Sequence, residues 1–551
     1  MNKKKIAILS NITVDLVKQK LKREYEIYVP EGFDTWIQEC INAESGLYQN
    51  EKDAIIVLLD GTEARSWKTR EDAEDRISLW KQAVALLCSR EKNVPIFVST
   101  IDFRENRIKA LVERRYAIEL EDDWYQYIQE ISERENNVYA FDVVDCIRDV
   151  GRNQFYSDKM WYMSNMPYSR EGLTLVVKEI KRVLESVFQA RKKLVVLDLD
   201  NTLWGGVIGE DGVEGIELSD HKEGQRFYDF QRQLLEMQKR GVLLAINSKN
   251  NEEDAKKAIQ NHPDMLLRED VFVAQKINWE NKASNIKNIS GELNLTEGSL
   301  VFVDDNPIER EVVKGVCPEV LVPDFPEDTT TLLSFAENLY FDYCRPLRVL
   351  NVDLQKTQMY QVEAKRKQEL ETSLDLDDYI AKLEMCVDIH KMRDEELDRV
   401  EQLCNKTNQF NVTTKRYTKT EILEIANNPG NSIYVVYAKD KYGESGLISV
   451  IILISDSNEV KIDTFLMSCR VMGRKLENVI LNELMDVLKV NYSKVHGLYL
   501  PTAKNAPVKE LYEKLGFTLI CENPEAKVYE KDLREYKKHE YTIYKNISFE
   551  G

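Results

Sequence analysis

The chain has 551 residues, 43% of them hydrophobic, with 95 acidic and 76 basic side chains and a formal net charge of −19. This length predicts about three or four domains of ~150 residues, and the hydrophobic content is typical of a folded chain. The acidic balance argues against a general nucleic-acid binder, which needs a basic face, and against attraction to anionic membranes.

The apolar runs are too short for a membrane span or a secretion signal. The longest, 448–454 and 242–246, have the length of buried strands, well below the ~18 residues of a span. After the positively charged start, residues 6–9 are the only apolar stretch, whereas a signal peptide needs a core of about 7–15 residues. We therefore expect a cytoplasmic protein without a membrane partner.

Cysteine and histidine usage excludes two further classes of protein. The nine cysteines are scattered and form no C-x-x-C pair, and the five histidines are scattered as well. This pattern is neither a disulfide framework nor a zinc site, and it argues against a metal centre built from histidines.

Residues 1–188 alternate strand-like and helix-like stretches. Polar segments of helical spacing, such as 78–87 and 124–134, separate the apolar runs. The strand-like runs are 5–10, 54–59, 94–100 and 138–143. Strands at this spacing predict a parallel, doubly wound α/β domain.

Residues 189–345 predict a second α/β domain, in which each strand ends in polar residues and leads into a helix pattern. Its strand-like runs are 193–198, 242–247, 271–274 and 300–303. Ligands of open α/β sheets bind at the carboxyl ends of the strands. We therefore expect the functional site of this domain at that edge.

The remainder predicts a helical linker and a mixed domain. Residues 346–376 are rich in charged, helix-favouring side chains. The stretch 347–371 contains no Gly or Pro, which suits a linking helix. Residues 377–551 predict a mixed α+β domain with a helix over 474–490. Its consecutive strands, expected to be antiparallel, are 432–438, 447–455 and 460–468. The chain as a whole is predicted to be an α/β protein of three domains.

Two carboxylates follow the strand at 193–198. Asp198 and Asp200, in the order D-x-D-x-T with Thr202, can both face the mouth of the sheet when the backbone bends there. One carboxylate can attack a phosphorus atom while the other passes a proton. Because concentrated negative charge repels a phosphate, such a site also needs a hard divalent cation such as Mg²⁺.

Further polar residues follow the later strands of this domain. Ser248 offers a hydroxyl, Lys282 a positive charge, and Asp304 with Asp305 metal-ligating oxygens. The alternative interpretation is a set of helix caps and loop acids, because Asp, Asn, Ser and Thr are common at such positions. The complete series, each member after an apolar strand, resembles the haloacid dehalogenase (HAD) superfamily of phosphotransferases.

That resemblance implies a role for each residue. Asp198 is the nucleophile and Asp200 the general acid and base. Ser248 and Lys282 neutralise the transferring phosphoryl group. Mg²⁺ is held by Asp198, the main-chain carbonyl of Asp200, and the Asp304–Asp305 pair.

Several longer runs are similar to the FkbH-like branch of HAD proteins. They are DLDNTLWGGVIGEDG (198–212), SKN (248–250), INWENK (277–282), VDDNP (303–307), KTNQFNVTT (406–414) and SCRVMG (468–473). The resemblance implies transfer of a glyceryl group from 1,3-bisphosphoglycerate to an acyl carrier protein, in polyketide or related biosynthesis, with release of phosphate. One position departs from the pattern: Leu199 stands where glyceryl-loading members often have a Cys, so no thioester can form there.

The spacing of the motifs leaves no room for a cap domain. Between Thr202 and Ser248 only a turn-rich flap, one helix and one strand fit. An uncapped site is open to a bulky or protein-tethered substrate.

The C-terminal domain contains a run, RVMGRK (470–475), that resembles the pyrophosphate loop of GNAT acyltransferases. Gly473 would let the backbone approach phosphate, with helix amides next to it. Lys475 replaces the usual small residue, which disfavours coenzyme A and suits a carrier-bound phosphopantetheine. The resemblance adds Arg470, Arg474 and Asn505 to this binding site.

A second GNAT-like run, LYEKLGF (511–517), implies that Tyr512 protonates a departing thiolate. The alternative is an amphipathic helix with Tyr512 in the core and Gly516 as its C-cap. Because both the protein and typical carrier proteins are acidic, we also expect a local positive patch for docking. The candidates, whose alternative is solvated surface charge, are Arg470, Arg474, Lys475, Lys406, Lys415 and Arg416.

The N-terminal domain loosely resembles an SGNH hydrolase, with Ser10 and Asn11 after its first strand. The first histidine of the chain is His221, and DKMW (158–161) stands where such hydrolases carry D-x-x-H. The resemblance therefore implies a degenerate copy without hydrolase activity.

Three functions remain in competition. The leading hypothesis is a Mg²⁺-dependent HAD enzyme that acts on a small phosphorylated substrate and loads an acyl carrier protein. The second is a phosphatase of a small or carrier-tethered phosphate with an inactive C-terminal domain. The third is a non-catalytic scaffold of a biosynthetic assembly, which the complete residue set around Asp198 disfavours.

Overall fold

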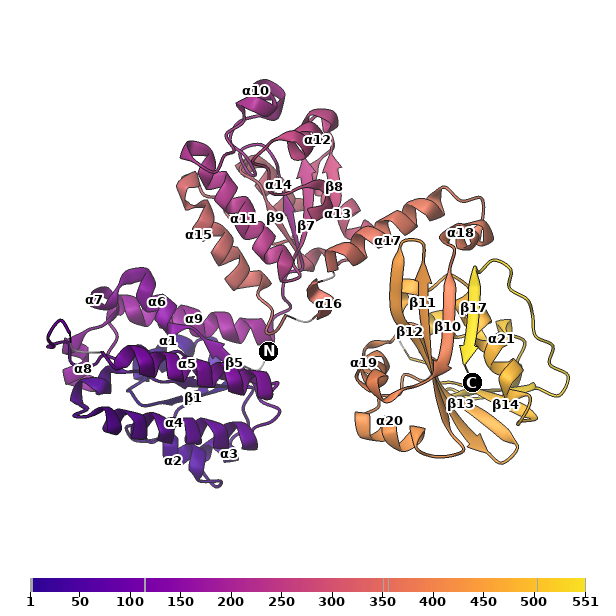
Figure 1. Cartoon of the computed structure of the whole chain (residues 1–551), viewed down its shortest axis with the longest axis horizontal. Helices are drawn as coiled ribbons and strands as arrows, with labels where there is room; N and C mark the ends of the chain where they lie inside the picture. The colour runs from indigo at the N-terminus through magenta and orange to yellow at the C-terminus, as the bar shows by residue number, and fades with distance from the viewer. Residues whose placement is uncertain (1–2, 113–114, 350, 355, 503, 551) are drawn as a thin grey trace. The chain divides into compact units, whose positions relative to one another are not determined.

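The structure is a computed structural model that describes residues 3–112, 115–349, 351–354, 356–502 and 504–550 (Figure 1). The chain divides into two compact units, residues 1–357 and 358–551. Two parallel sheets lie in the first unit and one mixed sheet in the second. The protein is therefore a multi-domain α/β chain, as predicted, and the finer division into three domains stays a prediction.

The N-terminal sheet has five parallel strands in the order β2-β1-β3-β4-β5. The strands are β1 (Lys4–Ser10), β2 (Tyr25–Tyr28), β3 (Ala54–Leu58), β4 (Ile96–Ser99) and β5 (Val138–Phe141). The helices are α1 (Asp15–Leu21), α2 (Trp36–Ile41), α3 (Gly46–Gln49), α4 (Arg70–Arg90), α5 (Ala117–Arg134), α6 (Val143–Val150), α7 (Arg152–Phe155), α8 (Asp158–Ser164) and α9 (Arg170–Phe188). The sequence did not reveal β2, because this short edge strand is only partly buried.

Alternation along β1 explains the doubly wound arrangement of this sheet. Ala7 and Leu9 face one apolar core, which also contains residues of α2, α4 and α5. Ile6 and Ile8 face the other, together with residues of α1, α6 and α9. Successive strand residues point to opposite faces, so a continuous apolar run needs helices on both sides (Figure 1).

The central sheet has the strand order β8-β7-β6-β9, all parallel, so β6 lies between β7 and β9. The strands are β6 (Leu194–Leu197), β7 (Leu243–Ser248), β8 (Phe272–Ile277) and β9 (Leu300–Val303). The helices are α10 (Ile208–Gly215), α11 (Gln225–Lys239), α12 (Glu252–Asn261), α13 (Lys282–Glu292), α14 (Pro307–Val316) and α15 (Leu332–Leu339). All four predicted strands are present. Between Thr202 and the end of β7 at Ser248 lie the flap with α10, a short 3-10 helix (Lys222–Gly224) and the helix α11, with no cap domain among these described residues.

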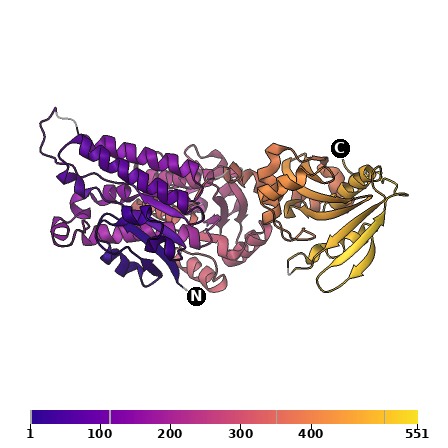
Figure 2. The same ribbon diagram turned by 90° about the horizontal axis from the view of Figure 1, so that it is seen from below.

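The second unit is drawn in orange to yellow in Figure 1 and Figure 2. It contains an eight-stranded mixed sheet in the order β15-β16-β14-β13-β12-β11-β10-β17. Its strands are β10 (Cys386–Lys391), β11 (Ser432–Asp440), β12 (Gly443–Asp456), β13 (Glu459–Met467), β14 (Lys494–Tyr499), β15 (Thr518–Glu522), β16 (Lys527–Asp532) and β17 (Asn546–Glu550). Strands β11, β12 and β13 are antiparallel neighbours, as the sequence predicted.

Helices cover both faces of this mixed sheet. Residues of α18 and α21 belong to one apolar core and residues of α19 and α20 to the other. The helices from the linker onward are α16 (Asn351–Leu354), α17 (Lys356–Glu371), α18 (Leu376–Leu383), α19 (Leu397–Lys406), α20 (Lys419–Ala426), α21 (Leu476–Leu488) and α22 (Leu511–Lys514). Helix α17 lies inside the predicted linking helix 347–371, and α21 lies inside the predicted helix 474–490.

Candidate active site

The site begins where β6 ends. The four residues of β6 are apolar and fully buried. The backbone N–H of Asp198, the next residue, donates to the Val303 carbonyl of β9 at 3.0 Å. Asp198 is therefore fixed at the carboxyl edge of the sheet, and only 6% of it is exposed. Leu199, the next residue, is completely buried in the core that also contains Trp204 and Ile208.

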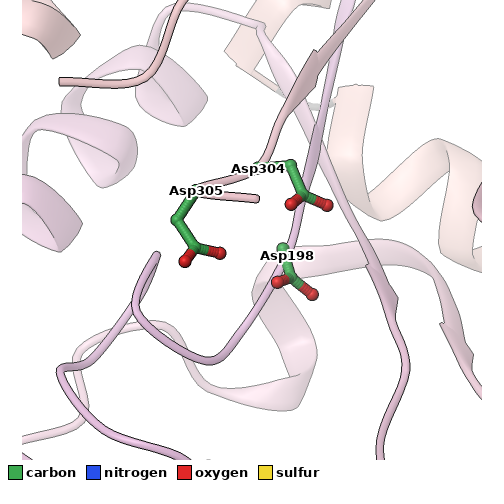
Figure 3. Close-up of side chains that lie close together, drawn as sticks. All are labelled: Asp198, Asp304 and Asp305. Atoms are coloured by element: carbon green, nitrogen blue, oxygen red, sulfur yellow. The ribbon is translucent and has the colours of Figure 1, made fainter. Parts of the chain in front are cut away.

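Three carboxylates meet at this edge. Asp304 and Asp305 follow β9, and together with Asp198 they offer oxygens that all lie within 4.8 Å of one another. Figure 3 shows the three side chains turned toward a shared space. Within the part of the chain that the structure describes, this is the one His, Cys, Asp or Glu cluster with metal-ligand spacing.

Lys282 balances part of this negative charge. Its Nζ lies 3.0 Å from Asp198 Oδ1 and 2.5 Å from Asp304 Oδ2, and its side chain is 4% exposed. Burial opposes the charged form, but Asp198 and Asp304 outweigh it and raise the pKa of Lys282. Burial also raises the pKa of Asp198 to about 6, against the effect of Lys282, and Asp305 likewise has a pKa raised to about 6 by burial and Asp198.

A chain of three amides holds Lys282 in place. The Asn247 side chain donates to the Lys282 carbonyl at 2.9 Å, and Asn285 donates to Asn247 Oδ1 at 3.0 Å and to Asn278 Oδ1 at 2.9 Å. The backbone N–H of Asn278 donates to the Ser248 carbonyl at 3.1 Å. These bonds connect β7, the loop after β8 and helix α13, so the Lys282 ammonium is positioned by three elements.

Asn250 joins Ser248 to Asp200. Its Nδ2 donates to Asp200 Oδ2 at 3.0 Å and to Ser248 Oγ at 3.1 Å. Ser248 is 1% exposed and hydrogen-bonds to Asp198. Asn250 belongs to the run SKN (248–250), but the sequence pattern predicted no role for it, because only the folded chain shows what its amide contacts.

The Asp200 carboxylate faces the flap. Its Oδ1 accepts from Trp204 Nε1 at 2.9 Å and from the Ile208 backbone N–H at 3.0 Å. With Asn250 on its other oxygen, this carboxylate has three donors and is separate from the three-carboxylate cluster. A proton-transfer role for the Asp200 carboxylate stays a prediction, and the predicted metal contact of Asp200 rests on its main-chain carbonyl alone.

Two more residues fix the 304–305 turn. The Thr202 hydroxyl accepts from the Asp305 backbone N–H at 3.2 Å. Arg310 donates to the carbonyls of Asp304 and Asp305 at 2.9 and 2.6 Å. Thr202 therefore acts on the site as a positioning residue, and Arg310 is a second one that the motif pattern did not indicate.

These residues fit a magnesium ion. Three converging carboxylates and one ammonium leave an excess of negative charge in a buried place. Carboxylate oxygens are the ligands that a hard cation prefers, and a buried excess of charge is costly unless it is compensated. Asp198, Asp304 and Asp305 are therefore the residues that would hold Mg²⁺.

Arg474, in the loop 470–475 of the second unit, does not contribute to the predicted positive patch. Arg474 is 3% exposed and lies 3.4 Å from Glu363 and 3.7 Å from Asp440. Lys475 Nζ pairs with Asp377 at 2.6 Å, and Arg470 donates to Ser468 Oγ at 3.3 Å. The expectation of Arg474 as a docking surface charge is wrong, because two acids of the same unit bury and neutralise it.

Gly473 and Lys475 do form a tight turn. Gly473 has φ +78° and Lys475 has φ 54°, both in the left-handed region. Glycine adopts this conformation readily and other residues rarely do. The turn that the sequence predicted is therefore present, immediately before α21.

The gap between β13 and β14 is filled by the chain itself. Their parallel pairing ends at Ile462 and Gly497. Beyond it, the Val412 N–H donates to the Phe465 carbonyl at 3.1 Å, and the Met467 N–H donates to the Phe410 carbonyl at 3.0 Å. Residues 410–412 thus occupy backbone groups of β13 beyond the end of its pairing with β14.

Asn505 and Tyr512 are both buried at this gap. Asn505 Nδ2 donates to the carbonyls of Asn411 and Leu500 at 3.0 and 2.9 Å, which holds the filling segment in place. Tyr512 is 1% exposed and its ring packs against Phe517 and Tyr529. Burial raises the pKa of Tyr512 well above its usual range. A binding role for Asn505 and an acid role for Tyr512 stay predictions.

The N-terminal sheet edge shows no nucleophile–base pair among its described residues. Ser10 Oγ donates to the Leu58 carbonyl at 2.6 Å. Asp158 pairs with Arg65 and Arg104 at 2.8 and 3.2 Å. Both residues that the SGNH resemblance singled out are thus engaged in local contacts.

No helix in the described residues is long and apolar enough to span a membrane.

The comparisons with known proteins found matches among solved structures. No protein-family model and no curated protein matches the chain. Among solved structures, the chain is similar to the N-terminal part of the protein BF1531 from Bacteroides fragilis, which contains a phosphatase domain and is complexed with Mg. The TM-score is 0.56 at 27% identity, over 63% of this chain and 95% of that chain.

Two acetyltransferases show a weaker likeness. Spermidine N-acetyltransferase from Vibrio cholerae, in complex with CoA and spermine, has a TM-score of 0.22 at 15% identity, over 27% of this chain and 95% of its own. The ribosomal-protein-S18-alanine N-acetyltransferase from Escherichia coli has a TM-score of 0.22 at 13% identity, over 28% and 99%. Scores this low support no conclusion, so the description of the second unit rests on its own strand order.

Proposed function

We propose that the central site catalyses Mg²⁺-dependent phosphoryl transfer with Asp198 as the nucleophile. The observation that carries this proposal is the buried convergence of Asp198, Asp304 and Asp305 around Lys282. The similarity to a solved structure with a Mg-bound phosphatase domain supports it.

The chain's own residues divide the chemistry. An Asp198 oxygen attacks the phosphorus atom, the bond to the leaving group breaks, and an aspartyl phosphate forms that water later hydrolyses. Asp200 gives a proton to the leaving group and takes one from the water. Ser248 and Lys282 hold the phosphoryl oxygens. Mg²⁺, when bound by the three carboxylates, would offset the charge of the phosphoryl group.

The finer proposal concerns the acyl group. The FkbH-like runs imply an acyl phosphate substrate, such as 1,3-bisphosphoglycerate, and an acyl carrier protein as acceptor. Because Leu199 has no thiol, the carrier's phosphopantetheine thiol would give its proton to Asp200 and attack the acyl carbon directly, with phosphate as the leaving group. This route forms no aspartyl phosphate, so Asp198 would serve in it as a Mg²⁺ ligand and not as the nucleophile. The lack of a cap domain between Thr202 and Ser248 supports access by a protein-tethered arm.

The second candidate is a phosphatase whose C-terminal unit is catalytically inert. Two observations favour it: Arg474 is neutralised inside the second unit, and residues 410–412 fill the gap beside β13. In this case the substrate phosphate is released as inorganic phosphate and no carrier protein is acylated.

The deciding experiment combines phosphate release with intact-mass spectrometry. The full chain, Mg²⁺, 1,3-bisphosphoglycerate and a purified phosphopantetheinylated carrier protein are incubated together. A mass increase of the carrier by one glyceryl group supports the acyl transfer, whereas phosphate release without it supports the phosphatase.

The first prediction is that Asp198→Asn lowers phosphate release by about a thousandfold or more, the scale of losing a catalytic nucleophile. The fold should be retained, because Asp198 lies at the sheet edge. Asp254→Asn, a half-exposed acid of α12, is the matched control. Turnover by Asp198→Asn at the parent rate, or full activity in excess chelator, would contradict the assignment.

A further inference from the structure

An ion pair connects the two loops on either side of Asp198. Lys249 follows the last residue of β7, and Glu309 lies in the first turn of α14, just after β9. Lys249 Nζ lies 2.6 Å from Glu309 Oε1. Since β6 lies between β7 and β9, this pair bridges the end of the strand that carries Asp198.

The distances allow the pair to pass over the nucleophile. Neighbouring strands lie about 4.8 Å apart, so β7 and β9 are separated by roughly 10 Å. Only the long side chains of Lys249 and Glu309, meeting in the middle, close that distance above β6. The pair thereby joins the two loops that flank the end of the Asp198 strand.

Lys249 differs from Lys282 in its surroundings. The Lys282 side chain is 4% exposed and is committed to Asp198 and Asp304. The Lys249 side chain is 36% exposed, and its partner Glu309 is 15% exposed. Partly exposed ion pairs contribute little to stability, so an anion of similar chemistry can take the place of Glu309 at low cost.

Glu309 itself does not depend on Lys249. It lies at the N-terminal end of α14, where the helix dipole stabilises a negative charge. Release of Lys249 therefore leaves Glu309 in a favourable position.

We propose that Lys249 recognises a second anionic group of the substrate, separate from the transferred phosphoryl group, by exchanging Glu309 for it. The inference rests on the proposed phosphoryl-transfer site and adds a specificity residue to it. The ligand chemistry is a carboxylate or phosphate a few ångströms from the reacting phosphorus. No covalent step is involved, because one ion pair replaces another.

Two matched small esters test this inference. Phosphoglycolate carries a carboxylate where ethyl phosphate carries a methyl group. Binding is measured by calorimetry, with Mg²⁺ present, on the full-length Asp198→Asn protein, because this variant should leave the ester unhydrolysed. Turnover is measured on the parent protein. We expect phosphoglycolate to bind about tenfold more tightly than ethyl phosphate, the scale of one charge-assisted hydrogen bond.

The variants should act in opposite directions. Adding Lys249→Met should reduce the preference for phosphoglycolate to about twofold or less, mainly through affinity or KM, because the recognising charge is lost. Adding Glu309→Gln should strengthen phosphoglycolate binding, since the ligand no longer competes with a resident carboxylate. Lys256→Met in α12 is the control, because it removes a surface ammonium paired with Glu252 at 2.7 Å. It should change the affinity for neither phosphoglycolate nor ethyl phosphate.

The outcomes separate this inference from the proposed function. If the parent turns over both esters and Lys249→Met does not change the preference between them, the inference is overturned, while phosphoryl transfer at Asp198 is still supported. A Lys249-dependent binding preference without any turnover supports the inference and contradicts phosphoryl transfer at Asp198. Equal losses of affinity for both esters in Lys249→Met and Glu309→Gln would show a structural clamp instead, and would overturn the inference.

Discussion

The two parallel sheets of the first unit both have polar side chains at their carboxyl edges, but they use them differently. In the N-terminal sheet, Asn11 donates to the Asp60 carbonyl at 2.8 Å and accepts from the Asp60 N–H at 2.9 Å. Arg152 Nε donates to both carboxylate oxygens of Asp102, at 2.9 and 3.0 Å. In the central sheet, three carboxylates share Lys282.

The difference shows what marks a site in this molecule. Polar residues after buried strands are present in both sheets, so their occurrence alone does not separate them. At the N-terminal edge the Asp60 carboxylate accepts from the Thr62 backbone N–H and Asp102 pairs with its own Arg152, whereas in the central cluster three carboxylates converge and share one ammonium. Burial of uncompensated charge is costly, and a bound divalent cation would compensate it. The predictions below test this difference in decreasing order of expected effect.

Lys282→Met tests the central edge. Without the ammonium, Asp198 and Asp304 face each other unpaired, and breaking a buried ion pair costs about 3–5 kcal/mol. We expect phosphate release to be lost. We also expect the β6 amides to exchange their hydrogens at lower urea concentrations than in the parent, because the domain is less stable. Mg²⁺ should restore more stability in this variant than in the parent, because the cation replaces the missing charge.

The control for this experiment lies in the same sheet. Lys276 of β8 pairs with Glu292 at 2.8 Å, and both side chains are 29% exposed. Lys276→Met should cost no more than about 1 kcal/mol, as exposed pairs do. If Lys282→Met were as stable as Lys276→Met without Mg²⁺, the central cluster would not hold the proposed excess of charge.

Arg474→Glu extends the comparison to the second unit. The variant places a third carboxylate beside Glu363 and Asp440, in a position that is 3% exposed. We expect a loss of about 3–5 kcal/mol, measured by urea unfolding with amide exchange in β13. Lys475→Glu, whose partner Asp377 is half exposed, should cost about 1 kcal/mol or less.

This pair of variants also separates structure from docking. A fully stable Arg474→Glu protein that had lost only acyl transfer to a carrier would restore the original interpretation of this loop as a docking patch. Reduced stability of Arg474→Glu, with normal stability of Lys475→Glu, would confirm that Arg474 is an internal residue.

Asp60→Asn tests the N-terminal edge. Burial raises the pKa of Asp60 to about 7 from its ordinary value of 3.8, against the hydrogen bonds from Thr62. A raised carboxyl pKa means that the folded state retains the proton longer than the unfolded state. Its contribution is therefore full below pH 3.8 and is lost as the pH rises through about 7.

The stability of the parent should accordingly decline between about pH 4 and pH 7 more steeply than that of Asp60→Asn, which carries no titrating group there. Amide exchange in β3 measures the difference in this domain. Asp15→Asn, an exposed acid of α1, is the control and should keep the parent's profile. Parallel profiles for the parent and Asp60→Asn would mean that Asp60 is ionised in the folded state throughout.

Much of the central site was predictable because it depends on local order. A buried apolar strand followed by Asp198, and another followed by Asp304 and Asp305, determines where each carboxylate emerges. Parallel strands bring their carboxyl ends to one edge, so these residues had to converge. Lys282 followed from the same argument through its place after β8.

The positioning residues were not predictable in this way. Asn250 has its role only because Asp200, fifty residues earlier, lies within reach of its amide. Lys249 and Glu309, sixty residues apart, meet only because β7 and β9 flank β6. The sequence shows each of these side chains, but their partners depend on strand order.

The sequence by itself therefore determined the α/β class, the absence of a cap domain between Thr202 and Ser248, and the carboxylate set around Asp198. These features depend on short patterns of burial and on the spacing of residues along the chain. The tertiary structure decided which charges remain available. Arg474 looks like a surface cation in the sequence, but Glu363, 111 residues away, and Asp440 neutralise it. Ion pairing and burial are set by long-range packing, so only the folded chain separates a free charge from a committed one.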